Sequence, residues 1–373
     1  MSGHPSAPLQ RAQALRRRRL VRRLKLSAWS ALLVSDPLDV SYLSGFSGED
    51  SYLMVGAGWA SLLTDGRFDE QARIECPGLE ILVRKGPMTD AMADVSRRHG
   101  LRRIGYQPSN LTVSAMRRME QRLGVRRLRP MEDGLLEQRA VKDAVEVRAI
   151  RRSAGVTQAA FRELAGRGAG WFIGRTERAV AAELDYLMQL GGAEGSSFPT
   201  IVAAGPHASL PHYRPGPTRI RAGQGLLIDW GARKDGYCSD LTRVLFLRTI
   251  PPKLARIYDV VLEAQRAGLA AVRSGATVRS VDAAARSVIE RAGLGERFTH
   301  GLGHGIGRAI HELPAISSRI DQVLRPGMVV TVEPGVYLPG VGGVRIEDDV
   351  LVSPGRSGRL TSLPTAIRDM LLR

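Results

Sequence analysis

Short apolar runs separated by helix-like segments mark the first third of the chain. Each run is bounded by turn-forming or charged residues and is too short for a buried helix, which predicts a short buried strand. Apolar residues at helical spacing predict helices over 90–99 and 114–123. Alternating strands and helices are typical of an α/β layer domain. The expected strands lie in SALLVSD, YLMVGAG, ASLLTDG, LEILVR and RRIGYQ.

Longer helical patterns follow, over 135–164, 177–190, 252–273 and 277–292. Thr277 is a candidate N-cap for the last helix, because a threonine hydroxyl can accept a hydrogen bond from a backbone N–H of the first turn. Paired strands are expected between and after these helices. Helices followed by paired strands, in two successive rounds, predict an α+β domain with helices outside one curved antiparallel sheet.

The first expected hairpin, GLLIDWGARKDGYCSDLTRVLFL, spans 225–247. Its two apolar runs flank the turn signal Lys-Asp-Gly at 234–236. Asp229 and Asp240 are nearly equidistant from that turn. We therefore expect the two carboxylates to be direct or diagonal neighbours across the strands.

The second expected hairpin, MVVTVEPGVYLPGVGGVRIEDDVLV, repeats this arrangement over 328–352. Glu333 and Glu347 flank its turn-forming stretch, 339–343. Like charges that face each other across strands are destabilising, and buried carboxylates without a partner cost more still. Two such pairs indicate a site for hard divalent cations, with two ions expected.

A glycine-rich stretch between the hairpins, THGLGHGIGRAIHELP, contains His300, His304 and His311. The alternate glycines over 301–307 disfavour a helix, so we expect extended chain with His300 and His304 on one face. Glycines there would let the backbone approach a metal or substrate closely. One histidine alone is more often a structural residue, but three beside four carboxylates favour a functional site.

A further histidine pair, His207 and His212, lies in the proline-rich segment FPTIVAAGPHASLPHYRPG. The prolines predict a rigid loop after a short strand. These histidines are either solvated residues of an ordinary surface loop or imidazoles presented to a substrate carbonyl.

Composition limits the class of protein. A chain of 373 residues with 43% hydrophobic and 24% charged residues is long enough for two globular domains. Nothing approaches the run of about 18 apolar residues that a membrane span needs, and we find no signal-peptide pattern. Cys76 and Cys238 form no metal or redox motif, so a reducing, cytoplasmic location is expected.

The net charge of +17 comes mainly from arginine. A cluster at 16–19, with Arg22 and Arg23, is interleaved with leucines at helical spacing. This pattern predicts the solvated face of a first helix, with Leu15 and Leu20 among its apolar partners. A basic surface can bind nucleic acid, but the scattered arginines favour a composition bias, so no nucleic-acid partner is expected.

Four segments together resemble successive motifs of the pita-bread metallopeptidases: IDWGARKDGYCSDLTR, HGLGHGIGRAIHELP, TVEPGVY and GGVRIEDD. Within that family the chain is most similar to the Xaa-Pro aminopeptidases and the Xaa-Pro dipeptidases (prolidases). The resemblance covers the whole chain. It implies an α/β creatinase/prolidase-like domain over 1–134, followed over 135–373 by an α+β pita-bread catalytic domain with a curved antiparallel sheet.

The resemblance also implies an activity, which is hydrolysis of the Xaa-Pro bond with release of the N-terminal residue of proline-containing peptides. Two divalent metal ions would be needed, manganese being favoured over cobalt or zinc. The five implied metal ligands are Asp229, Asp240, His304, Glu333 and Glu347. Asp229 would bind one ion alone, Asp240 and Glu347 would bridge both, and a homodimer is the implied assembly.

Catalytic and substrate-binding roles follow from the same resemblance. Glu333 would move a proton from the attacking water to the leaving proline nitrogen, and His212 and His311 would contact the substrate. His300 resembles an additional active-site histidine, and Arg345 could orient Glu347 or hold a substrate end. His207 could help to line the proline pocket.

Three alternatives are set against this interpretation. Creatinase-like relatives work without metals but have lost ligands, and methionine aminopeptidases normally lack the N-terminal domain. Non-enzymatic pita-bread domains bind peptides, histones or RNA, which would suit the basic charge, but they usually lose metal ligands too. The choice between dipeptidase and aminopeptidase stays open.

Overall fold

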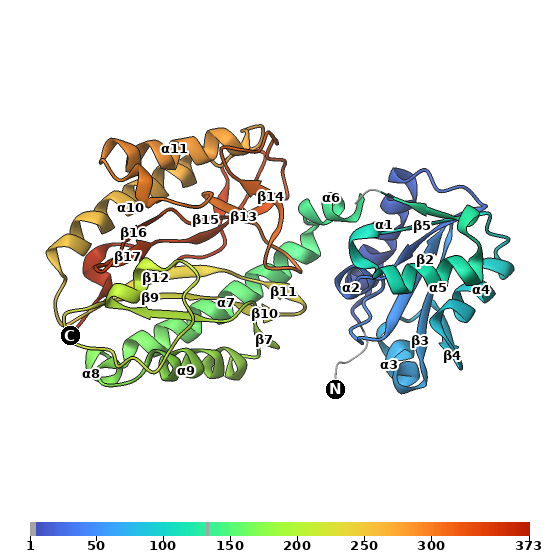
Figure 1. Ribbon diagram of the computed structural model, residues 1–373, viewed down its shortest axis with the longest axis horizontal. Coiled ribbons are helices and arrows are strands. Elements are labelled where there is room, and N and C mark those ends of the chain that lie inside the picture. Colours follow the sequence, from blue (N-terminus) through green and yellow to red (C-terminus); the bar gives the residue numbers. More distant parts are fainter. Residues whose placement is uncertain (1–4, 132–133) are drawn as a thin grey trace. The chain divides into compact units, whose positions relative to one another are not determined.

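The chain folds into two compact units, Met1–Gln138 and Arg139–Arg373, in a computed structural model that describes residues 5–131 and 134–373 (Figure 1). We call them unit 1 and unit 2. The expected boundary, between 134 and 135, falls inside helix α6 (Gly134–Ala140), which ends in unit 2. Among the described residues, no helix combines the length and the apolar character needed to cross a membrane.

Unit 1 is built on one six-stranded sheet in the order β4-β3-β2-β1-β5-β6. Strand β2 pairs antiparallel with β1 and β3, and the other neighbours are parallel. The strands are β1 (Ser30–Val34), β2 (Ser51–Gly56), β3 (Trp59–Asp65), β4 (Glu80–Arg84), β5 (Arg103–Tyr106) and β6 (Leu128–Pro130). This is the α/β fold expected from the sequence.

Helices cover both faces of this sheet because its strands are apolar on both sides. In β1, Leu32 and Val34 join one buried cluster, while Ala31 and Leu33 join the cluster on the opposite face. The first cluster draws residues from α1 (Ala7–Arg23), α2 (Pro37–Ser44) and α3 (Asp69–Glu75), and the second from α4 (Met88–Arg98) and α5 (Val113–Leu123).

The basic first helix differs in part from the expected solvated face. Arg16 is buried, and its guanidinium donates to the carbonyl of Tyr42 at 3.1 Å. Leu15 is 47% exposed, whereas Leu20 is fully buried. The apolar stripe of α1 is therefore narrower than the leucine pattern suggested, and an arginine stem fills part of it.

Unit 2 begins with a helix break that the sequence pattern did not reveal. The expected helix over 135–164 is two helices, α6 and α7 (Ala144–Gly166). Asp143 caps α7, because its side chain accepts from the backbone N–H of Glu146 while the Glu146 carboxylate accepts from the N–H of Asp143. The N–H of Lys142 donates to the carbonyl of Gly327 instead of continuing the helix.

The other helices of unit 2 lie close to their expected positions. They are α8 (Ala169–Phe172), α9 (Glu177–Leu190), α10 (Pro252–Ala271) and α11 (Val278–Arg291). The hydroxyl of Thr277 accepts from the N–H of Ser280 at 3.1 Å, as expected for an N-cap. In Figure 1, α10 and α11 lie on one side of the strands of unit 2, and α7, α8 and α9 lie on the other.

The β-structure of unit 2 forms several short sheets, in the orders β20-β12-β9-β8, β14-β13-β15-β18-β19, β11-β10-β7 and β16-β17. The N–H of Glu347 donates to the carbonyl of Thr242 at 3.2 Å and joins the hairpin strands to each other. The strands are β7 (Gly195–Ser196), β8 (Ile201–Ala204), β9 (Gly225–Trp230), β10 (Ala232–Lys234), β11 (Tyr237–Cys238), β12 (Leu241–Leu247), β13 (Gly303–Gly305), β14 (Glu312–Ile316), β15 (Val329–Val332), β16 (Gly335–Leu338), β17 (Gly342–Arg345), β18 (Asp348–Leu351), β19 (Gly358–Arg359) and β20 (Leu371–Leu372).

The first hairpin has the turn that its sequence predicts. Lys234 pairs with Tyr237, which leaves a two-residue loop in which Asp235 has φ 52° and Gly236 has φ 71°. Positive φ at both positions is the type I′ geometry that suits the twist of a hairpin.

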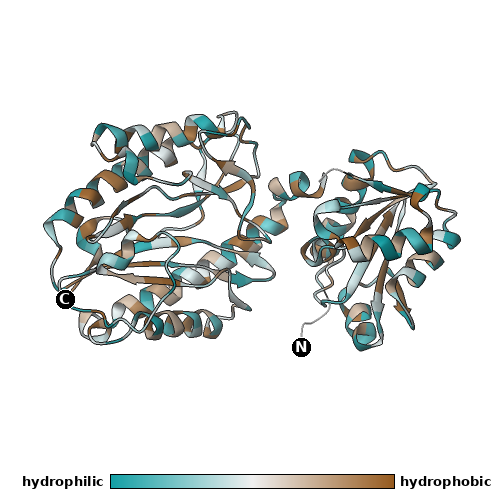
Figure 2. Ribbon diagram, in the orientation of Figure 1, coloured by the Kyte–Doolittle hydropathy of each residue, from teal (hydrophilic) through white to brown (hydrophobic). Residues whose placement is uncertain are grey.

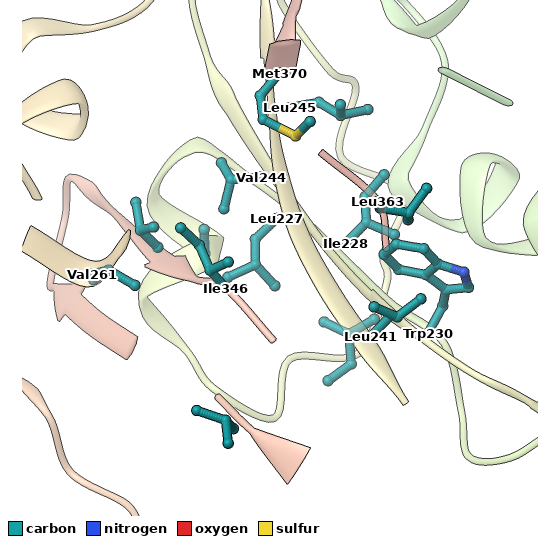
Figure 3. Packing of buried hydrophobic residues seen from close by; sticks show 14 of the residues in the cluster. Leu227, Ile228, Trp230, Leu241, Val244, Leu245, Val261, Ile346, Leu363 and Met370 are labelled. Carbon is teal, nitrogen blue, oxygen red and sulfur yellow. The ribbon is translucent and has the colours of Figure 1, made fainter. Parts of the chain in front are cut away.

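The core around β9 and β12 fixes which side chains of the hairpin face the interior of the unit. Figure 3 shows Leu227 and Val244, which pair across the strands, on one side of the ladder, and Trp230 on the other. Trp230 stacks on Phe161 of α7 at 4.5 Å. Asp229 shares the face of Leu227 because side chains alternate along a strand. In Figure 2 these central strands are largely brown, whereas α10 and α11 carry both brown and teal residues.

A buried ion pair behind this ladder gives a stability prediction. The side chains of Arg243 and Asp348 are fully buried and lie 2.9 Å apart, while Arg359, 45% exposed, approaches the same carboxylate at 3.4 Å. We expect Arg243→Met to lower the free energy of unfolding by about 3–5 kcal/mol, because it leaves a buried carboxylate without its main cation. Urea unfolding would measure the loss.

Arg359→Met is the matched control, since it removes a cation from the same acceptor at the surface. Its expected cost is about 0–1 kcal/mol. Equal losses in the two variants would contradict the assignment of the buried arginine as the main partner.

Candidate metal centre

The second carboxylate pair lies where two strand ladders separate. Val332 of β15 pairs with Asp348 of β18, and Gly335 of β16 pairs with Arg345 of β17. Glu333 and Glu347 occupy the interval between these ladders, so their side chains are not held in a cross-strand pair and can converge on one point.

The first pair is diagonal, which is one of the two arrangements expected from the sequence. Asp229 lies opposite Thr242, two residues beyond Asp240. Diagonal neighbours on one face are about 7–8 Å apart at their Cα atoms. A short side chain at each position therefore leaves room for an ion between the two carboxylates.

His304 lies on β13, between β14 and β15. The alternate glycines allow this close packing: a Cβ on Gly303 would lie 2.2 Å from the carbonyl oxygen of Thr331, and one on Gly305 would lie 2.2 Å from that of Leu313. The close approach expected from these glycines is thus to the neighbouring strands. Because these positions carry no Cβ, β13 packs closely against the neighbouring strands, and this places His304 beside the carboxylates.

The ligand atoms of Asp240, His304 and Glu347 all lie within 4.8 Å of one another. His304 Nε2 is 3.5 Å from Asp240 Oδ2 and 3.5 Å from Glu333 Oε1. His304 Nδ1 lies 3.0 Å from the carbonyl of Gly305, which can only accept, so Nδ1 carries the hydrogen. The lone pair of Nε2 is therefore directed into the cluster.

Burial perturbs the carboxylates of the cluster strongly. Desolvation raises the pKa of Asp229, and it raises those of Asp240 and Glu347 well above their usual values, with repulsion from neighbouring carboxylates adding to the effect. In the part of the chain that the structure describes, Asp229 Oδ1 and Glu347 Oε1 are buried and accept no hydrogen bond. Oxygens of this kind suit divalent cations.

Arg345 supplies positive charge at the edge of the cluster. Its Nη2 lies 2.5 Å from Asp229 Oδ2, and its Nε donates to the hydroxyl of Thr242, which in turn donates to Glu347 Oε2 at 2.7 Å. Arg345 thus contacts Asp229 directly and reaches Glu347 only through Thr242. The expectation that it orients a carboxylate stays a hypothesis, now with Asp229 as the contact.

His300 is tied to the same arginine. Tyr337 accepts from Arg345 Nη1 at 2.8 Å and lies 2.9 Å from His300 Nε2, while His300 Nδ1 lies 2.7 Å from the carbonyl of Gly301. Burial lowers the pKa of His300, which keeps the imidazole neutral and lets Nε2 accept from the tyrosine hydroxyl. Both ring nitrogens are thus occupied within the protein.

A cavity of about 650 Å³ opens over the cluster. All five expected metal ligands line it, as do His212, His300, His311 and Arg345. His207 does not line it: its Nδ1 lies 2.8 Å from Glu177 Oε1. The proposed place of His207 in a substrate pocket is therefore replaced by a contact with a buried carboxylate.

The loop that carries His311 is fixed by the next residue. Glu312 Oε1 accepts from the N–H groups of Arg308 and Ala309 and from Arg139 Nη2 at 2.6 Å, and Oε2 lies 3.1 Å from Lys142 Nζ. These two cations outweigh desolvation and lower the pKa of Glu312 to about 2. His311 itself is exposed to the cavity.

Three polar side chains of the site were not predicted from the sequence. Thr242 follows Asp240 by two residues on one strand, so alternation could have placed it on the same face. Asp349 accepts from the N–H of Asp240 at 3.1 Å, and Tyr337 joins Arg345 to His300. Neither has a sequence signal, because each acts on a residue from another part of the chain.

The donor set fits hard or borderline divalent ions, since it offers carboxylate oxygens and one imidazole nitrogen. Asp240, His304 and Glu347 could hold one ion together. The unpaired oxygen of Asp229 faces the same cavity and could extend the site to a second ion.

The comparisons with known proteins identify the family of this chain. Residues 148–354 match the model of Metallopeptidase family M24, and residues 16–141 match the Creatinase/Prolidase N-terminal domain. The chain therefore belongs to metallopeptidase family M24. The predicted resemblance and the fold class are confirmed, and membership of a metallopeptidase family implies divalent metal ions.

Individual relatives cover nearly the whole chain. The uncharacterized peptidase YqhT of Bacillus subtilis is 35% identical over 335 residues, which are 89% of this chain and 94% of that protein. A Xaa-Pro dipeptidase from Bacillus anthracis superposes with a TM-score of 0.90 at 33% identity, over 97% of this chain and 100% of its own. An X-Pro aminopeptidase from Thermotoga maritima gives 0.88 at 34%, over 95% and 99%.

The raised pKa values predict how metal-free protein responds to pH. Burial raises the pKa of Asp349 to about 8 from 3.8, and Asp240 and Glu347 shift in the same direction. The folded state then holds more protons than the unfolded state, so stability falls as pH rises from about 4 to about 8. Thermal unfolding of chelator-treated protein should show a falling midpoint across this window.

Saturating Mn²⁺ should raise the midpoint most at the alkaline end, where fewer protons compete for the carboxylates. Asp349→Asn should flatten the slope of the metal-free protein. A midpoint that rises steadily from about pH 5 to about pH 8 without metal would contradict the assigned direction.

The pKa shift of Glu312 gives the opposite dependence of stability on pH. Its lowered pKa means that its contribution to stability is complete above pH 4.5 and is lost as pH falls through about 2. We expect Glu312→Gln to cost about 3 kcal/mol at neutral pH, because Arg139 and Lys142 stay buried without an anion. The difference between variant and wild type in urea unfolding should shrink at about pH 3, and a constant difference would exclude the ion pairs as its cause.

Proposed function

We propose that this protein hydrolyses the Xaa-Pro peptide bond with two bound divalent metal ions and releases the N-terminal residue of proline-containing peptides. The observation that carries the proposal is the convergence of Asp240, His304 and Glu347 on one point of a cavity that His212 and His311 also line. A Xaa-Pro dipeptidase and an X-Pro aminopeptidase among the similar structures support the substrate class.

Each residue of the cluster has a role in this proposal. The two ions would be held by Asp229, Asp240, His304, Glu333 and Glu347. When bound, the ions would supply the positive charge that makes water nucleophilic near neutral pH and polarises the scissile carbonyl. Arg345 and Thr242 would hold Asp229 and Glu347 in position.

Proton movement would fall to Glu333. This carboxylate accepts a hydrogen bond from the hydroxyl of Thr331 at 3.2 Å and lines the cavity, so its position is fixed while its second oxygen can take a proton from water. It would then pass that proton to the leaving proline nitrogen. His212 and His311 would donate to the substrate carbonyl as charge develops on its oxygen, and His300, held by Tyr337, lines the same cavity.

The residues that line the cavity support a proline at the bond. A bond before proline is a tertiary amide with no N–H, so the site needs no acceptor for the scissile nitrogen. Apolar residues that could receive the proline ring line the same cavity: Phe198, Pro199, Ile310 and Ile316. Arg214 and Arg319 also line it and offer positive charge to a substrate carboxylate. Manganese as the metal, a homodimer and a cytoplasmic location belong to the same proposal.

Metal-dependent cleavage of defined peptides tests the function. Chelator-treated protein should release the N-terminal residue of Xaa-Pro and Xaa-Pro-Xaa peptides only after Mn²⁺ is added. Glu333→Gln keeps the size of the side chain but removes its basicity, and we expect kcat to fall by about 10²–10⁴-fold. The exposed Glu296→Gln, on a surface turn, is the matched control and should leave kcat unchanged.

Metal analysis accompanies the assay and separates the outcomes. Two ions per chain with no cleavage of either peptide would disprove the proline assignment. Salt-sensitive nucleic-acid binding by a protein that takes up no metal would instead favour a non-enzymatic role for the basic surface. Relative rates on the two peptides would distinguish a dipeptidase from an aminopeptidase.

A further inference from the structure

We propose that Glu177 is a positioning residue that, together with His207 and Tyr213, holds the loop carrying His212 against the cavity. The inference rests on the proposed function, because His212 is the substrate-facing histidine of that reaction. None of the three residues belongs to the metal cluster.

Glu177 binds both ends of the loop at once. It is the first residue of α9 and is fully buried. Its Oε1 accepts from the N–H of Ala204 at 2.9 Å and lies 2.8 Å from His207 Nδ1, whereas its Oε2 accepts from the hydroxyl of Tyr213 at 2.7 Å and from the N–H of Gly216 at 3.3 Å. One carboxylate therefore fixes a loop of a dozen residues at its start and at its end.

His212 depends on this arrangement because its own side chain has no anchor. Among the described residues the His212 imidazole makes no hydrogen bond, although it lines the cavity. Its neighbour Tyr213 is held by Glu177, and the N–H of Tyr213 donates to the carbonyl of Leu210 at 3.1 Å. The direction of His212 is thus set by the backbone on either side of it.

His207 acts on the same loop through Tyr213. The two rings stack with centroids 4.5 Å apart and an interplanar angle of 25°. A carboxylate can only accept, so His207 donates from Nδ1 to Glu177, and this bond fixes the face of its ring that Tyr213 packs on. Burial and the adjacent Glu177 raise the pKa of Tyr213 to about 12, which keeps its hydroxyl a donor.

Four substitutions separate positioning from general stability. Glu177→Gln replaces one accepting oxygen by an NH₂ group that cannot accept from the donors facing it, and we expect kcat/KM for Xaa-Pro cleavage to fall at least about tenfold with metal content unchanged. His207→Asn keeps a donor nitrogen near the position of Nδ1 and should retain most activity, whereas His207→Ala should not. Glu183→Gln is the matched control, since Glu183 lies on the same helix and pairs with the partly exposed Arg167 at 2.8 Å.

Hydrogen exchange of the metal-loaded protein gives a readout that does not depend on cleavage. Glu177→Gln and His207→Ala should speed exchange in peptides covering 204–216 and leave the β9 strand unchanged, while Glu183→Gln changes neither. Faster loop exchange with unchanged kcat/KM would reduce Glu177 to a structural role and overturn the inference, as would unchanged exchange. If Glu177→Gln does not fold, the His207→Asn and His207→Ala pair decides by the same two measurements.

Failure of the proposed function would look different. The wild-type protein would then cleave no Xaa-Pro peptide, whereas failure of this inference leaves wild-type cleavage intact and leaves either loop exchange or kcat/KM unchanged in the variants.

Discussion

The concentration of negative charge at one buried point is the constraint on which unit 2 depends. Asp229, Asp240 and Glu347 are withdrawn from water, and repulsion from neighbouring carboxylates, Glu333 among them, raises their pKa values beyond the effect of burial. Arg345 offsets part of this charge, but it is itself buried and needs Tyr337 and Thr242 to satisfy its guanidinium. Carboxylates in such surroundings are either protonated or paired with cations. Divalent ions bound at this point would therefore stabilise the fold of the site as well as supply its chemistry.

Three consecutive acidic residues, 347–349, each contact a different part of unit 2. Glu347 points to the cavity, Asp348 pairs with Arg243 on the opposite side, and Asp349 accepts from the N–H of Asp240. Arg243 also donates to the carbonyl of Glu347 at 2.6 Å. A displacement of this short segment would disturb a candidate metal ligand, a buried ion pair and the other hairpin together. Because of this coupling, Glu347 is held at the junction of two strand ladders and not in a flexible loop.

Local sequence signals predicted the features that depend only on neighbouring residues, such as a tight turn and a helix cap. The Asp-Gly turn needs positive φ at both residues, and it fixed the register that makes Asp229 and Asp240 diagonal neighbours. Thr277 capped its helix as expected. The helix over 135–164 was wrong as one element, because the N–H of Lys142 bonds to Gly327, and apolar spacing carries no record of that tertiary contact. His207 looked equivalent to His212 in its loop, yet His207 contacts the distant Glu177, whereas His212 lines the cavity.

The contacts of Glu312 determine where the chain can be truncated to produce unit 2 alone. The family match begins at residue 148, which invites a fragment starting there. The cations that neutralise Glu312 lie upstream, at Arg139 and Lys142, together with the backbone bond from Lys142 to Gly327. A fragment from 148 would leave this carboxylate buried without a cation beside the loop of His311. The smallest autonomous fragment of unit 2 therefore has to include Lys142, which lies between the two family matches, and Arg139, which lies inside the match to the N-terminal domain.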